Sequence, residues 1–132
     1  MSSIFSKIIN REIPAYIVAE NDNFLAFLDL FPLMEGHTLV IPKLEIDYFF
    51  DLDDNLFNEL NIFSKKVAIG LKRAIPCKRI GMTVIGLEVP HAHIHLIPIN
   101  SINDMNFSNK KLTLTDQDFL NISNKIKQKI SL

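Results

Sequence analysis

A row of histidines near residue 93 constrains this chain more than any other feature. Residues 91–97 read His-Ala-His-Ile-His-Leu-Ile, so three of the four histidines in the chain are spaced two residues apart. A period of two is that of a β-strand, and it predicts a strand with imidazoles on one face and apolar side chains on the other. A core strand has no structural use for three imidazoles, because an unpaired buried polar group costs about 1–3 kcal/mol. The row therefore indicates a site where a polar ligand binds or reacts.

Two kinds of chemistry use such a row. Neutral imidazole is the commonest metal ligand, and two histidines separated by one residue on a strand can chelate a metal ion such as zinc. In a metal-free alternative, one imidazole attacks an electrophile while its neighbours bind oxyanions and move protons. The strict spacing argues against a third reading, a run of surface or core histidines without chemistry. The residues by themselves leave the first two alternatives open.

The composition excludes several classes of protein. The chain has 132 residues, 48% of them hydrophobic, which is enough for one domain with its own core. Its 14 basic and 15 acidic residues give a net charge of −1, so we expect neither nucleic acid nor a membrane surface as a partner. No stretch approaches the roughly 20 apolar residues of a membrane span. The single cysteine, Cys77, excludes an intrachain disulfide and favours a reducing cytoplasm.

Apolar periodicity and turn residues predict the secondary structure. Strands are expected over residues 16–20, 24–29, 37–42, 79–85 and 91–99, the first two joined as a hairpin. Helices are expected over residues 4–10, 53–75 and 112–131, and a shorter one over 44–50. Thr115 and Asp118 resemble a capping box at the start of the last long helix. The polar residues 100–111 are expected to form a mobile surface loop.

Four segments, in order, resemble the histidine triad (HIT) family. Along the chain they are Phe-Ser-Lys-Ile-Ile-Asn-Arg-Glu-Ile-Pro-Ala at 5–15, Ala-Phe-Leu-Asp-Leu-Phe-Pro at 26–32, Gly-His-Thr-Leu-Val-Ile-Pro-Lys at 36–43 and the triad at 91–97. The resemblance covers residues 4–99 and is strongest to the Hint-type nucleoside phosphoramidases. It implies an α+β fold, in which a five-stranded antiparallel sheet packs with one long helix, a short N-terminal helix and a C-terminal helix. We expect residues 1–132 to form a single domain.

The resemblance also implies a reaction. The chain is expected to be a metal-independent hydrolase or nucleotidyl transferase that acts on the α-phosphate of nucleoside 5′-monophosphate derivatives, of the adenosine 5′-phosphoramidate type. His93 is implied as the nucleophile that forms a nucleotidyl-histidine intermediate, and a neutral imidazole at pH 7 suits that role. His95 is implied to bind or protonate the phosphate oxygens, while His91 and His37 complete a hydrogen-bonded cluster. No cofactor and no metal is implied.

The same resemblance suggests how a purine nucleotide, an AMP derivative, is held. Asp29 is implied to accept hydrogen bonds from the ribose 2′- and 3′-hydroxyls, and a carboxylate suits a cis-diol because it offers only acceptors. The nucleobase would lie against a wall made of Phe5, Ile8, Phe27 and Leu30. The resemblance further implies a homodimer in which helix 53–75 and strand 79–85 meet their copies.

Departures from the family pattern keep alternatives open. Leu87 stands where Gln is common, Glu88 replaces a hydroxyl donor, and Ile99 stands where the Fhit branch commonly has Arg. With no cation expected on the leaving-group side, we predict a preference for phosphoramidates over dinucleoside polyphosphates. Serines replace the N-terminal cysteines that hold structural zinc in some relatives, so no zinc is expected there. The alternatives are a nucleotide-binding regulatory module with incidental catalysis, a diadenosine polyphosphate hydrolase, and a zinc hydrolase with three histidine ligands.

Overall fold

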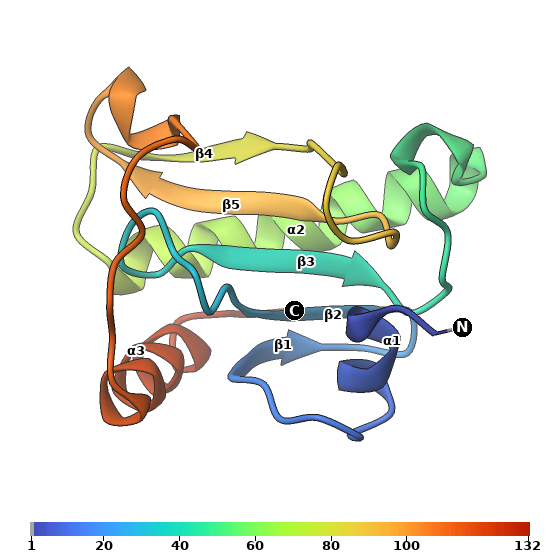
Figure 1. Cartoon of the computed structure of the whole chain (residues 1–132), viewed down its shortest axis with the longest axis horizontal. Helices are drawn as coiled ribbons and strands as arrows, with labels where there is room; N and C mark the ends of the chain where they lie inside the picture. Colours follow the sequence, from blue (N-terminus) through green and yellow to red (C-terminus); the bar gives the residue numbers. More distant parts are fainter. Residues whose placement is uncertain (1) are drawn as a thin grey trace.

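A five-stranded antiparallel sheet forms the centre of the molecule (Figure 1). In the computed structural model, which describes residues 2–132, the strands lie in the order β1-β2-β3-β5-β4. Their bounds are β1 Ile17–Glu20, β2 Phe24–Leu28, β3 Thr38–Pro42, β4 Arg79–Thr83 and β5 Ile94–Ile99. Every pair of neighbours is antiparallel. The predicted fold class and the predicted hairpin of the first two strands are confirmed.

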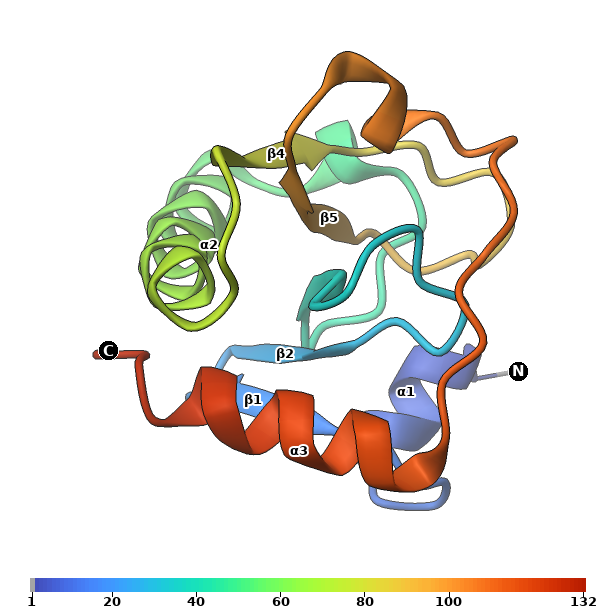
Figure 2. The same cartoon turned by 90° about the vertical axis from the view of Figure 1, so that its left-hand side faces the viewer.

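Helices cover the two faces of the sheet unequally. The long helix α2 (Asp54–Ala74) and the C-terminal helix α3 (Asp116–Lys127) pack on one face, and the short helix α1 (Ile4–Ile9) packs on the other (Figure 2). Two 3₁₀ turns, η1 (Phe49–Asp51) and η2 (Ile102–Met105), complete the elements. No helix within residues 2–132 is both long and apolar enough to cross a membrane.

Strand β2 separates two hydrophobic clusters. Phe24, Ala26 and Leu28 face the main core under α2 and α3, whereas Leu25 and Phe27 face a smaller cluster with α1. All five side chains are buried, because successive residues of a strand point to opposite faces and both faces are covered here. One face of this strand therefore serves the core, and the other faces the region where α1 lies.

The helix boundaries follow local sequence signals. Asp53 caps α2 by accepting the Leu56 N–H at 2.8 Å. The predicted capping box of Thr115 and Asp118 opens α3, which ends at Lys127 rather than near residue 130. Apolar residues spaced three and four apart form a stripe along α2. Its members Leu60, Phe63, Val67 and Leu71 are buried, and Leu56 is partly buried.

Three local predictions are wrong. Residues 44–50 form no helix beyond η1, because this segment bonds to distant parts of the chain: the Ile46 carbonyl, for example, accepts the Ala92 N–H at 2.7 Å. The final strand begins at Ile94 instead of residue 91, after a turn in which the His91 N–H bonds to Val89. Residues 100–111 contain η2 with its own capping box, so this stretch is locally structured instead of an irregular loop.

The surface expected to form a homodimer is exposed in the single chain. Strand β4 is an edge strand, and Met82 on it is half exposed. Ile62 and Ile69 on α2 are also exposed large apolar residues. The homodimer itself stays a prediction, to be measured by sedimentation equilibrium.

Candidate active site

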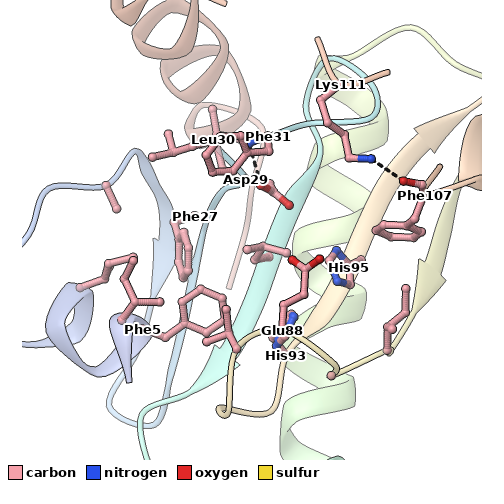
Figure 3. Close-up of a pocket in the computed structure, with 18 of the residues that line it drawn as sticks. Phe5, Phe27, Asp29, Leu30, Phe31, Glu88, His93, His95, Phe107 and Lys111 are labelled. Carbon is pink, nitrogen blue, oxygen red and sulfur yellow. Dashed lines mark hydrogen bonds between the residues drawn. The ribbon is translucent and has the colours of Figure 1, made fainter. Parts of the chain in front are cut away.

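A pocket of about 400 Å³ opens beside β5 on the face of the sheet that carries α1 (Figure 3). This volume lies within the usual range for small-molecule sites. The residues expected to contact a nucleotide all line it, namely Phe5, Ile8, Phe27, Asp29, Leu30, His93 and His95. His37 and His91 do not line it. The structure therefore brings together two of the four histidines at the pocket and places the other two behind them.

Hydrogen bonding fixes which nitrogen of His93 is free. Its Nδ1 lies 2.7 Å from the His91 carbonyl oxygen. A carbonyl only accepts, so Nδ1 carries the proton and Nε2 of the neutral ring keeps a lone pair. The Phe5 ring packs edge-on against this imidazole, with centroids 5.1 Å apart and an interplanar angle of 87°. When neutral, His93 thus carries its lone pair on Nε2, on a ring held from two sides.

The same reasoning fixes His37 and His95. The Leu33 N–H donates to His37 Nδ1 at 3.1 Å, so Nε2 of a neutral His37 carries the proton. That Nε2 lies 2.9 Å from His95 Nδ1, which must accept, leaving the proton of His95 on Nε2. The His93 and His95 rings are 5.0 Å apart. A lone-pair nitrogen and an N–H donor therefore sit on neighbouring imidazoles of the pocket.

Burial keeps the supporting pair uncharged. Burial, with a contribution from the Lys111 charge, lowers the pKa of His37 to about 4. Burial lowers the pKa of His95 to about 3, helped by His37 and His93 and opposed by the nearby Asp29 carboxylate. Both rings are neutral at pH 7, as the pattern of donors and acceptors requires.

His91 lies outside the pocket and is held on both ring nitrogens. Its Nε2 is 2.8 Å from the Pro42 carbonyl oxygen, and its Nδ1 is 2.8 Å from Ser3 Oγ. The predicted row of three imidazoles on one strand face is therefore wrong, because the chain turns before β5 begins. His91 does join the cluster, but through its carbonyl bond to His93.

The geometry also bears on metal binding. Zinc ligation by the row of His91, His93 and His95 would need His91 to turn toward the other two, and its nitrogens are already engaged. Within residues 2–132, the one group of three potential ligand side chains is Asp29, His37 and His95, with ligand atoms within 4.8 Å of one another. The hydrogen bond between His37 and His95 accounts for the closeness of that pair.

Asp29 lies at the end of β2 with its carboxylate directed into the pocket (Figure 3). One oxygen accepts the Phe31 N–H at 2.8 Å, and the other lies 3.6 Å from His37 Nε2. The first bond belongs to the turn after the strand, and it orients the side chain. The second oxygen keeps acceptor capacity for a ligand.

Sequence reasoning missed two residues that complete the pocket. Phe107 packs its ring 4.9 Å from that of His95, and Lys111 donates from Nζ to the Asn109 carbonyl at 3.1 Å and to the Phe107 carbonyl. Both line the pocket. Lys111 therefore places a cation at the pocket, where the sequence led us to expect none. Neither residue belongs to a periodic pattern, and only the turns of 100–111 bring them to the histidines. Glu88 also lines the pocket (Figure 3).

Comparison with known proteins agrees with the fold and the motifs. The HIT domain family matches residues 10–102. An uncharacterized HIT-like protein of Borreliella burgdorferi is 38% identical over 96% of this chain and 97% of its own length. The adenosine 5′-monophosphoramidase HNT1 of Saccharomyces cerevisiae is 35% identical over 72% of this chain and 61% of its own.

The solved structures show the same likeness. A crystal structure of a Hit-like protein from Bartonella henselae, described as involved in cell-cycle regulation, superposes with a TM-score of 0.84. It is 28% identical and covers 98% of this chain and 97% of its own. The matched domain, these relatives and the shared fold show that the chain belongs to the histidine triad family.

Proposed function

We propose that the chain hydrolyses adenosine 5′-phosphoramidates and similar nucleoside 5′-monophosphate derivatives. One observation carries the proposal: the hydrogen bonds leave the lone pair of a neutral His93 on Nε2 and an N–H donor on Nε2 of His95, and the two rings lie 5.0 Å apart in the pocket. Such a pair can attack a phosphorus atom and stabilise the charge that develops on its oxygens. The monophosphoramidase activity named for the yeast relative supports the same reaction.

The reaction proceeds in two steps. The lone pair of His93 Nε2 forms a bond to the α-phosphorus, and the P–N bond to the leaving amine breaks as that nitrogen takes up a proton from solvent water. His95 Nε2–H donates a hydrogen bond to a non-bridging phosphate oxygen. Water then attacks the phosphorus of the nucleotidyl-histidine and releases one proton to the solvent. The P–Nε2 bond breaks with its electron pair returning to Nε2, and AMP leaves. His37 holds the tautomer of His95, and His91 holds that of His93.

The two sides of the pocket suggest the orientation of the substrate. Phe5, Phe27 and Leu30 lie on one side of His93 and His95, and Phe107 with Lys111 lies on the other (Figure 3). The apolar side suits the nucleobase, with Asp29 at the ribose between the base and the phosphate. The leaving group then extends toward Phe107 and Lys111.

Lys111 supports a second candidate function, hydrolysis of dinucleoside polyphosphates. Its ammonium offers the charge that a polyphosphate leaving group needs, and at an effective dielectric of 20 a unit charge about 4 Å away contributes roughly 4 kcal/mol before screening. Glu88, which also lines the pocket, opposes such a group. The first candidate remains favoured because a protonated amine leaves readily without a cation.

A competition assay in EDTA tests both candidates. We expect kcat/KM for adenosine 5′-phosphoramidate to exceed that for diadenosine tetraphosphate, with no loss of activity on chelation. Lys111→Gln should lower tetraphosphate hydrolysis about tenfold and change phosphoramidate hydrolysis less than threefold. The exposed Lys110→Gln serves as the matched control. A higher kcat/KM for the tetraphosphate would favour the second candidate function over the first. Abolition of turnover by EDTA would favour the alternative of a zinc hydrolase.

Replacing Asp29 by asparagine should distinguish ribonucleotides from their 2′-deoxy analogues. The variant loses a charge-assisted hydrogen bond to the diol, worth about 1.5–3 kcal/mol, so kcat/KM should fall about tenfold or more on the ribo substrate and less on the deoxy substrate. The amide oxygen of asparagine can still accept the Phe31 N–H, which preserves the turn. Equal losses on both substrates would remove Asp29 from the ribose site.

A further inference from the structure

A set of hydrogen bonds ties the start of α1 to the back of the histidine cluster. We call it the N-terminal latch, and it comprises Ser3, Ser6, Glu45 and His91. The Ser3 N–H donates to Glu45 Oε1 at 2.6 Å, and the Ser6 hydroxyl donates to the same oxygen at 2.7 Å. Ser3 Oγ lies 2.8 Å from His91 Nδ1. None of the four residues lines the pocket.

The direction of each bond in the latch is determined. His91 Nε2 faces the Pro42 carbonyl and must donate to it, so Nδ1 of the neutral ring accepts from the Ser3 hydroxyl. Ser3 Oγ in turn accepts the Ser6 N–H at 3.0 Å as the N-cap of α1. Ser3 and His91 are both buried. Loss of the Ser3 hydroxyl would therefore leave an unpaired acceptor on His91 and an unpaired donor on the helix.

Glu45 supplies the charged part of the latch. The Ser3 N–H and the Ser6 hydroxyl lower the pKa of this carboxyl to about 2. The carboxylate is therefore ionised throughout the physiological range, although its side chain lies at the surface. Bonds to a charged acceptor are stronger than neutral ones.

Helix α1 depends on such anchors because it is short. It has six residues, and isolated helices below about 12–15 residues are marginal in water. Yet α1 carries Phe5 and Ile8 of the pocket wall. The Phe5 ring packs 5.4 Å from that of Phe27 and 5.1 Å from that of His93. Whatever holds α1 in place therefore holds this wall in place.

We propose that Ser3 and Glu45 are positioning residues for the nucleobase wall, setting affinity for the nucleoside part of the ligand through α1 without touching it. The inference rests on the proposed function only in taking the pocket as a nucleotide site. It predicts that substitutions in the latch weaken the binding of ligands that have a nucleobase and leave the affinity for ligands without one unchanged.

Calorimetric binding of AMP and of ribose 5-phosphate tests the latch without requiring turnover. Ser3→Ala should weaken AMP binding about tenfold and change ribose 5-phosphate binding less than twofold. Ser3→Thr keeps the hydroxyl and should restore most of the AMP affinity, and Ser2→Ala, at an exposed neighbour, should leave both affinities unchanged. Hydrogen exchange should become faster in residues 4–9 of Ser3→Ala and stay slow in the sheet.

The outcomes separate the latch from the proposed function. A wild-type protein that does not bind AMP overturns the proposed function. A wild-type protein that binds AMP while Ser3→Ala binds both ligands normally, or loses both equally, overturns the latch. If Ser3→Ala does not fold, Glu45→Ala tests the latch instead, because Glu45 is exposed and its replacement disturbs the fold less. The AMP affinity of this variant should fall while its ribose 5-phosphate affinity is kept.

Discussion

Replacing His93 by alanine is expected to abolish turnover of adenosine 5′-phosphoramidate while AMP still binds. His93 Nε2 is the nitrogen that carries the lone pair of the neutral ring, and its removal prevents the covalent intermediate. General acid or base help contributes about 10²–10⁴ in rate, so loss of the nucleophile should cost more than His95→Ala does. Single-turnover rates measure the loss, and calorimetry measures AMP binding.

Two further measurements make the His93 assignment specific. Acid quenching of the wild-type reaction should trap a nucleotidyl group on the peptide that contains residue 93, detectable by mass spectrometry. His91→Ala should be slowed less than His93→Ala, because His91 acts through its backbone carbonyl, which alanine retains. A His91→Ala variant slower than His93→Ala would contradict the choice of nucleophile.

Mild acid is expected to destabilise the fold through the buried imidazoles. The folded pKa values of His37 and His95, about 4 and about 3, lie below the unfolded value of 6.5. The unfolded chain therefore takes up these protons first, and stability present above pH 6.5 is lost as the pH falls toward the folded values. From pH 7.5 to pH 5, the free energy of unfolding should drop by about 2 kcal/mol for each imidazole, at about 1.4 kcal/mol per pKa unit.

Urea denaturation at pH 7.5 and at pH 5 measures this loss. The window stays above the ordinary pKa range of carboxyl groups, so the acidic side chains contribute little to the change. The variant His95→Gln removes one of the two imidazoles and should show a smaller difference between the two pH values. An equal difference in that variant would assign the acid sensitivity to other groups.

Local signals predicted most of the fold. The turn after residue 20, the capping box of Thr115 and the stripe on α2 are each contained in a few neighbouring residues, and each is present in the structure. The predictions of a helix at 44–50 and of a strand over 91–93 were wrong for the opposite reason. Their backbone bonds join residues far apart in sequence, as between Ile46 and Ala92, and no local pattern encodes such a partner.

The site was predictable only where it coincides with a motif. Asp29 and His93 stand in segments that resemble the family, and both line the pocket. Phe107 and Lys111 come from a polar stretch without periodicity, and their approach to His95 depends on how η2 and the following turns fold. The role of Ser3 in the latch likewise could not be predicted from the sequence, because its partner His91 lies 88 residues away.

The double burial of β2 determines where ligand preference can change. Phe27 faces the pocket while Phe24 and Ala26, on the same strand, fill the main core. A one-residue slip of the strand would exchange these faces, so the register that fills the main core also fixes position 27 at the pocket. Adaptation to a different nucleobase would therefore come more readily from Ile4 and Leu30, which line the same pocket but are exposed and lie outside the sheet.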